Sequence, residues 1–221
     1  MFQSAKSSHF RFPSLIAVVG ATLASLWVSA PASSQTNNDP YAAVTFMIGR
    51  GTDTGFTQIM VEPWTVDIVD LSMVSVALST RLGTVSELTG SSDLGFIGNH
   101  FSFDLEAGTA YRFGDESQGE FWGAIYLRYD GFPWNDTVYT SIAANTGVSL
   151  LTDTSEFERS RSDGQTSRLL HYLAPEITFA DPSNKNLELV VKLHHRSGVF
   201  GTFDGVSGGS TFIATGIRLR F

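Results

Sequence analysis

The chain of 221 residues contains no cysteine, and this absence excludes disulfide-stabilised scaffolds, thiolate metal sites and cysteine nucleophiles. Basic residues are also scarce. Of the 14 Lys and Arg residues, Lys6 and Arg11 lie before residue 36, whereas none of the 22 Asp and Glu residues does. The rest of the chain is therefore strongly acidic, which argues against nucleic acid as a partner and against docking on an anionic surface by charge alone. Beyond residue 35, no apolar run approaches the roughly 20 residues that a membrane-spanning helix needs.

The N-terminal segment has the pattern of a cleavable secretory signal peptide. Lys6 and Arg11 form a basic region, the run from Leu15 to Val28 is apolar, and small residues follow at Ser29 and Ala30. We assign residues 1–30 to this signal, with cleavage between residues 30 and 35, and residues 36–221 to a single domain. Because no cysteine follows the cleavage region, a lipid-anchored protein is not expected.

Residues 99–113 alternate between apolar and polar side chains with a period of two, which is typical of a β-strand with two different faces. The run is longer than the usual strand of about 5–6 residues in soluble proteins. The same alternation returns along the chain. We expect strands at 42–49, 67–82, 99–113, 120–131, 137–151, 167–180, 187–198 and 210–221.

These strands predict an all-β fold, an eight-stranded antiparallel transmembrane β-barrel located in the outer membrane. Most of them reach the length of about 9–11 residues with which a tilted strand crosses a bilayer. The sequence ends in Arg218-Leu219-Arg220-Phe221, and a terminal aromatic residue is typical of the last strand of outer-membrane barrels. A soluble β-sandwich also alternates, and it is the alternative fold.

The connections follow from this topology. With both termini in the periplasm, 131–136 and 181–186 become short periplasmic turns, and 152–166 becomes an extracellular loop. Residues 83–98 then form an unusually long periplasmic turn. A barrel of eight strands is filled by its own side chains, so we expect paired charges inside and no open pore. The inward polar residues are Asp104, Glu106, Arg112, Glu120, Arg128, Glu176, Lys192, Arg218 and Arg220.

Two polar residues interrupt the outward, apolar face of strand 187–198. His195 and Ser197 share that face, and both lie near the outer-leaflet interface because this strand runs away from the periplasm. If Phe179 pairs with Leu187 across the preceding turn, His171 lies opposite His195, with a register uncertainty of about two residues. The sequence thus brings two imidazoles and a hydroxyl together on the outer wall.

A hydroxyl beside an imidazole is the minimum for acyl transfer. The base takes the proton, the hydroxyl oxygen attacks an ester carbonyl, and backbone N–H groups hold the oxyanion. His195 and Ser197 can supply the first two groups, while Gly198 and the glycine-rich segment 201–209 let the backbone approach a substrate. The alternative is that polar residues at a strand end simply meet the headgroup zone, and the spacing leaves both interpretations open.

The segment Leu193-His194-His195-Arg196-Ser197-Gly198, shortly before the terminal aromatic residue, resembles the His-x-Ser motif of the lipid A 3-O-deacylase family. Members of that family are eight-stranded outer-membrane barrels that hydrolyse the ester-linked acyl chain at position 3 of lipid A. The resemblance implies His195 as base and Ser197 as nucleophile, with lipid A, a part of lipopolysaccharide, and outer-membrane lipids as partners. It implies neither a cofactor nor a metal.

The chain departs from the family pattern at two positions. Gly198 stands where the family has Asn, which bears on the groups that hold the oxyanion. The family's glutamate, which orients the catalytic histidine, would fall near Gly209, which has no carboxylate. Asp204 is the nearby carboxylate, and His171 is an alternative neighbour for the imidazole of His195.

We therefore predict a serine esterase, a carboxylic ester hydrolase that acts on lipid A in the outer leaflet. The alternative is a small outer-membrane barrel without catalytic activity, structural or adhesive, that acts through loops 50–66 and 152–166. A carboxylate beside His195 would discriminate between the two.

Overall fold

The computed structural model describes residues 42–221, so the expected signal peptide and the start of the domain lie outside the described residues. No helix between residues 42 and 221 has the length and apolar character needed to cross a membrane. The strands are β1 (Ala42–Thr52), β2 (Ile68–Thr84), β3 (Phe101–Gly114), β4 (Gln118–Tyr129), β5 (Tyr139–Leu151), β6 (Leu169–Leu173), β7 (Glu176–Asp181), β8 (Asn184–Ser197) and β9 (Gly209–Arg220). The helical segments are α1 (Phe56–Val61), η3 (Pro63–Thr65), α2 (Val85–Thr89), η4 (Ser92–Leu94), α3 (Gly95–His100) and α4 (Glu156–Ser160).

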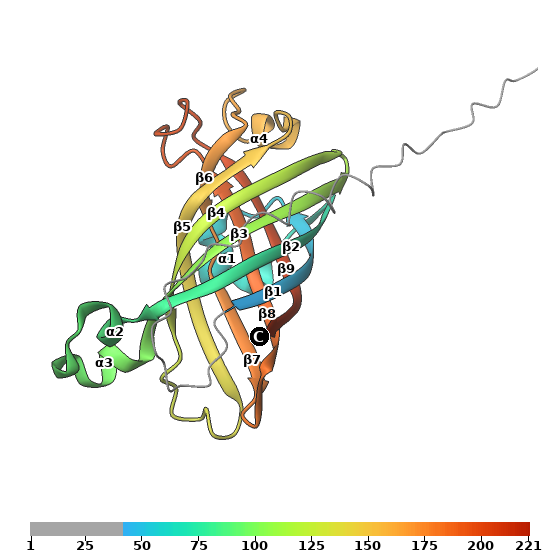
Figure 1. The fold of residues 1–221 in the computed structure, drawn as a ribbon. Helices are drawn as coiled ribbons and strands as arrows, with labels where there is room; N and C mark the ends of the chain where they lie inside the picture. The colour runs from blue at the N-terminus through green and yellow to red at the C-terminus, as the bar shows by residue number, and fades with distance from the viewer. Residues whose placement is uncertain (1–41) are drawn as a thin grey trace, which may run out of the picture. The chain divides into compact units, whose positions relative to one another are not determined.

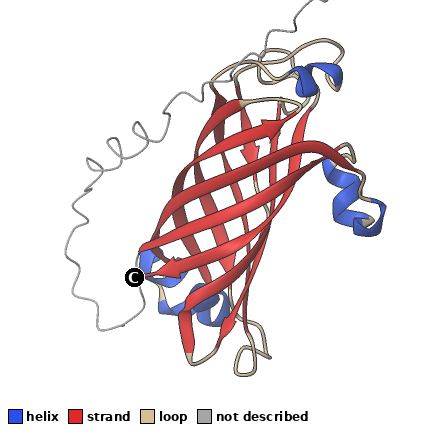
Figure 2. Ribbon diagram, turned by 90° about the vertical axis from the view of Figure 1, so that its right-hand side faces the viewer, coloured by secondary structure: helices blue, strands red, loops and turns tan. Residues whose placement is uncertain are grey.

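The strands close into an antiparallel ring. Neighbouring strands follow the order β4-β3-β2-β1-β9-β8. Strands β6 and β7 both lie between β8 and β5. The pairing of β5 with β4 closes the ring. Since β6 and β7 together occupy one position, the ring has eight members (Figures 1 and 2). The predicted eight-stranded barrel is confirmed.

A proline divides the strand that we expected at 167–180. Pro175 has no N–H to donate, so the ladder is interrupted between β6 and β7. The neighbours still make contact there, because the N–H of Leu193 donates to the carbonyl of Pro175 at 3.0 Å. The N–H of Ala174 donates to the side-chain oxygen of Asn145. The strand therefore stays in the wall with a local break.

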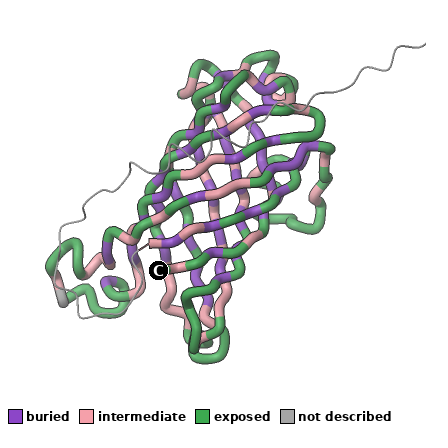
Figure 3. Tube along the Cα trace, turned by 45° about the vertical axis from the view of Figure 1, so that its right-hand side comes forward, coloured by how far each residue is buried: buried purple, intermediate pink, exposed green. Residues whose placement is uncertain are grey.

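Buried and more exposed residues alternate along most of the length of the long strands, as β4 and β8 show most regularly (Figure 3). On β8, Lys192 is buried in the lumen, whereas its neighbour Val191 faces outward, as the parity of the sequence predicted. The outer wall exposes large apolar side chains, which a soluble sandwich would bury. They include Ile48, Val74, Leu78, Leu105, Phe121, Ile125, Leu127, Ile142, Val148, Leu189 and Ile217.

Paired charges fill the lumen, as predicted. The carboxylate of Glu176 forms three ion pairs, with nitrogen–oxygen distances of 2.6 Å to Arg128, 2.9 Å to Arg218 and 3.2 Å to Lys192. A buried carboxylate needs such partners because its desolvation is costly. Further ion pairs join Arg112 to Glu120 and Glu158, Arg128 to Asp104, Lys192 to Glu106, Arg196 to Glu158, and Arg218 and Arg220 to Glu188.

The expected long turn at 83–98 is a small helical hairpin. A capping box begins α2: Glu87 donates its N–H to the Thr84 hydroxyl, and the N–H of Thr84 donates to the Glu87 carboxylate at 2.7 Å. This hydrogen bond lowers the pKa of Glu87, because it favours the charged carboxylate. The hairpin leaves the barrel at the end that carries the β7–β8 turn, which is the periplasmic end.

Helix α1 of the β1–β2 connection lies beside the wall, whereas the β5–β6 and β8–β9 connections lie at the opposite, extracellular end of the barrel (Figure 1). The predicted loop 152–166 lies here and contains α4. Arg161 of this loop binds the carboxylate and carbonyl of Asp53 in the β1–β2 connection. The two connections are therefore tied together above the wall that carries His195 and Ser197.

Candidate active site

β8 presents His195 and Ser197 on its outward face near its extracellular end. The residues between and before them, Arg196 and His194, point inward and are buried. Alternation therefore fixes the direction of both candidate side chains. Their α-carbons are two residues apart along the strand, which corresponds to about 6.6 Å.

Thr211 on β9 holds the imidazole of His195. The two residues are directly paired across the strands, and Nδ1 of His195 lies 2.8 Å from Oγ1 of Thr211. Gly209, which lies nearest to the place where the family has glutamate, pairs with Ser197 instead. A Cβ at Gly209 would lie 1.8 Å from the carbonyl oxygen of Arg196, so a side chain does not fit there. A neutral hydroxyl thus contacts the imidazole where a carboxylate was sought.

The register between β6 and β8 places His171 opposite Ser197. Phe179 pairs with Leu189, so the predicted pairing with Leu187 is wrong by two residues. The shift is an even number, and His171 therefore keeps its outward direction. Its Nε2 lies 3.0 Å from Oγ1 of Thr146 on β5.

The hydroxyl of Ser197 makes no hydrogen bond to any residue between 42 and 221, and Ser197 is neither buried nor fully exposed. Directly opposite residues on antiparallel strands have β-carbons about 4.5–5.5 Å apart. Ser197 is thus flanked by His171 across the strand pair and by His195 along its own strand. Its hydroxyl is free to rotate between them.

The β1–β2 connection covers part of the site from outside. Phe56 of α1 stacks on His195, with ring centroids 4.5 Å apart and an angle of 27° between the planes. Thr211 has the outward direction of its strand, yet it is buried. Figure 2 shows the helical part of this connection standing outside the wall, at the right of the view.

Asp204 and Gly198 are engaged elsewhere. The carboxylate of Asp204 accepts a hydrogen bond of 2.5 Å from the hydroxyl of Ser167, so the structure does not bring it to His195. The N–H of Gly198 donates to the carbonyl of Gly208 at 3.1 Å, which leaves it unavailable to an oxyanion in this conformation. No carboxylate among residues 42–221 makes an ion pair or hydrogen bond with His195.

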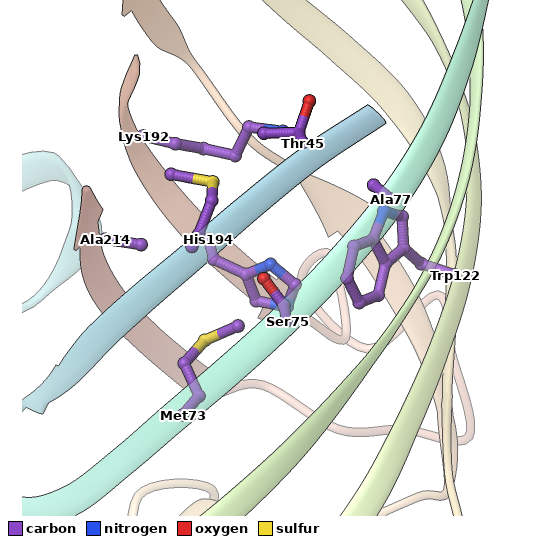
Figure 4. Close-up of a pocket in the computed structure, with 9 residues that line it drawn as sticks. Thr45, Met73, Ser75, Ala77, Trp122, Lys192, His194 and Ala214 are labelled. Carbon is purple, nitrogen blue, oxygen red and sulfur yellow. The ribbon is translucent and has the colours of Figure 1, made fainter. Parts of the chain in front are cut away.

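A second histidine environment lies inside the barrel. Nε2 of His194 lies 2.8 Å from the carboxylate of Glu120, and its Nδ1 lies 3.2 Å from the hydroxyl of Tyr172. A small cavity beside it is lined by residues that include Trp122 and Lys192 (Figure 4). All five side chains are buried, so these groups fill the lumen and do not meet the lipid. Within the described chain, no cluster of three or more His, Asp or Glu side chains is placed to hold a metal ion.

Sequence reasoning missed three side chains that shape the site: Thr211, Thr146 and Phe56. Cross-strand pairing would have found Thr211, had the register of β8 and β9 been known. Thr146 depends in the same way on the register of β5. No local sequence pattern indicates that Phe56, in the β1–β2 connection, packs against His195 on the barrel wall.

Comparisons with known proteins locate the fold. No family model matches the sequence, and no curated protein does either. Among solved structures, the chain is similar to the outer membrane enzyme PagL, with 14% identity, a TM-score of 0.54, and coverage of 81% of this chain and 99% of that one. It is also similar to Neisserial surface protein A (11% identity, TM-score 0.47, coverage of 81% and 97%) and to Ail of Yersinia pestis (12%, 0.35, 82% and 99%). This likeness concerns the fold, and together with the apolar outer wall it identifies an outer-membrane β-barrel.

Proposed function

We propose that the protein is a serine esterase of the outer leaflet that hydrolyses the acyl chain at position 3 of lipid A. Ser197 is the nucleophile and His195 the base. The observation that carries the proposal is the outward pair His195 and Ser197 at the extracellular end of a lipid-facing wall, with Thr211 bound to Nδ1 of the imidazole.

The proposed reaction uses these two side chains in turn. In the tautomer whose Nδ1–H donates a hydrogen bond to Oγ1 of Thr211, Nε2 is the basic atom of the ring. The Ser197 hydroxyl gives its proton to Nε2, and its oxygen attacks the ester carbonyl carbon. The tetrahedral intermediate then expels the sugar hydroxyl, which takes the proton back from His195. Water hydrolyses the acyl-enzyme by the same proton route, and this step releases the fatty acid and restores Ser197.

The location supports a lipid substrate. The apolar wall below the site faces the hydrocarbon core, so an acyl chain can lie along it while its ester reaches the level of Ser197. Lipid A, and its 3-linked chain in particular, is favoured by the resemblance of Leu193–Gly198 to the lipid A 3-O-deacylase motif. The reaction as written uses no metal and no cofactor.

A barrel without catalytic activity is the second candidate, and two observations favour it. The Ser197 hydroxyl is not hydrogen-bonded to His195, and Phe56 covers one face of the imidazole. Catalytic hydrogen bonds are often absent until a substrate binds, so these observations are also compatible with an enzyme. Only a measurement of enzymatic activity therefore distinguishes the esterase from the non-catalytic barrel.

Purified barrel in detergent micelles, mixed with lipid A and analysed by mass spectrometry, tests the proposal. Wild type should release the 3-linked acyl chain, whereas Ser197→Ala should reduce the release to background, because the nucleophile is gone. Ser183→Ala is the matched control: Ser183 is a periplasmic turn hydroxyl bound to Asp181, and its loss should leave the activity unchanged. Intact lipid A with folded wild type would instead support the non-catalytic barrel.

A further inference from the structure

The helical hairpin that joins β2 to β3 exposes an apolar surface that neither the barrel core nor the candidate active site uses. Three of its large apolar side chains are more than half exposed, Leu88 at 53%, Phe96 at 58% and Ile97 at 60%, and Leu94 is 40% exposed. Between residues 83 and 100 there is no Lys or Arg, and the acidic residues are Glu87 and Asp93. The surface is therefore apolar and is not built for anionic headgroups.

The hairpin is a compact unit. Gly98 of α3 approaches α2 so closely that a Cβ there would lie 2.1 Å from the hydroxyl of Ser86. His100 closes the hairpin onto the next wall strand, because its Nδ1 lies 3.2 Å from the carboxylate of Asp130. These contacts fix the direction in which the exposed side chains point.

The apolar surface of the hairpin is continuous with the lipid-facing wall. Leu82, the last outward apolar residue of β2, is exposed, and Leu88 packs next to the adjoining Gly83. At the other end, the ring of Phe96 lies 6.3 Å from that of Tyr129, which in turn contacts the ring of Phe132 at 5.0 Å. Aromatic rings at this level of a barrel mark the membrane–water interface.

The hairpin also projects sideways and not downward. In Figures 1 and 3 it stands beside the wall, at a higher level than the tip of the β7–β8 turn. The hairpin therefore lies beside the lipid-facing wall and not below the rim of the barrel.

We infer that the helical hairpin 85–100 is an interfacial anchor that inserts Leu88, Phe96 and Ile97 into the periplasmic leaflet of the outer membrane. The occupant of the apolar surface is the lipid that already surrounds the barrel, since the two surfaces are continuous. Insertion rests on apolar burial, because the segment has no basic side chain to attract anionic lipids. The anchor does not depend on the activity proposed for Ser197.

Single-cysteine spin labelling tests this inference, and the absence of native cysteine makes each label unique. Full barrels carrying Ile97→Cys or Asp93→Cys are labelled with a nitroxide and refolded into vesicles of phosphatidylethanolamine and phosphatidylglycerol. Collision rates are measured with oxygen, which concentrates in lipid, and with a water-soluble nickel complex. Leu127→Cys on the wall gives the lipid reference.

The label at Ile97 should collide more often with oxygen than with the nickel complex, as the label at Leu127 does, and the ratio should reverse at Asp93. A higher nickel rate at Ile97 would place the hairpin in water and overturn the inference. Low rates with both reagents would mean that protein, such as a second copy or another periplasmic protein, covers the surface, and this result would overturn it as well. Heat-dependent mobility in gels verifies that each variant is folded.

Discussion

In the proposed mechanism, Thr211 occupies the position that decides how well His195 works as a base. An oriented imidazole needs a partner on Nδ1, and here the partner is a neutral hydroxyl at 2.8 Å. A carboxylate would also stabilise the imidazolium that forms during the reaction, whereas a hydroxyl only orients the ring. We therefore expect a slower esterase than one with a carboxylate at this position.

The variant Thr211→Val removes this hydrogen bond and keeps the shape of the side chain. A neutral hydrogen bond contributes about 1 kcal/mol, so kcat should fall by roughly five-fold while KM stays close to that of wild type. Thr211→Ser retains the hydroxyl and should retain most of the rate. Steady-state kinetics with lipid A micelles measure both, and equal rates for Thr211→Val and wild type would show that Thr211 does not orient the base.

For single residues, the sequence predicts which way a side chain points better than which residues lie beside it. The outward direction of His195 and Ser197 follows from alternation alone and is observed. The pairing of His171 depends on where the β7–β8 turn begins, and with the register shift between Ala180 and Asp181 the observed pairing differs from the predicted one by two residues. Asp204 is close in sequence, but its backbone has a positive φ of 51° in a loop that directs it to Ser167.

Strand β8 carries both lipid-facing residues and the two residues of the candidate site. Its central residue Val191 faces outward between Ile177 and Thr215, while its extracellular end carries the polar pair. The same strand therefore contributes lipid contact, lumen charge through Lys192 and the proposed chemistry. Each role depends on whether the residue has an odd or even position in the strand, which decides its face, and on how far along the strand it lies.

Replacement of Val191 tests the membrane assignment of this strand. A charge on the outer wall near the bilayer midplane costs about 2–4 kcal/mol, so Val191→Arg should lower the free energy of unfolding by this amount. Val191→Leu, which stays apolar, is the matched control. Urea unfolding in lipid vesicles measures both variants, and equal stabilities would mean that this face does not meet hydrocarbon.

The sequence indicates the strands well and the connections poorly. Alternation locates β3, β4, β5 and β9 within a few residues, because each strand has one apolar and one polar face. It does not reveal the break at Pro175, since the alternation continues across it. The hairpin 85–100 also lacks a strong pattern, because its helices are only five or six residues long.

For the whole molecule, closure of the ring leaves the outer wall as the surface on which the reaction proposed for Ser197 would take place. Glu176 and the other paired charges fill the lumen, and the site residues are directed away from it. A substrate that enters laterally from the membrane meets Ser197, whereas one that comes through the barrel would not. The predicted barrel, its filled interior and its location follow from composition and periodicity, while the proposed activity rests on one pair of side chains, His195 and Ser197.

Covalent labelling of Ser197 tests most directly whether His195 activates this residue as a nucleophile. A lipophilic fluorophosphonate reacts with a serine only when a neighbouring base activates the hydroxyl. Folded wild-type barrel should gain one adduct, which peptide mass spectrometry should locate at Ser197, and His195→Asn should remain unlabelled. If folded wild type stays unmodified at Ser197, or if His195→Asn is labelled at the same rate, then His195 does not activate Ser197 and the esterase account is wrong.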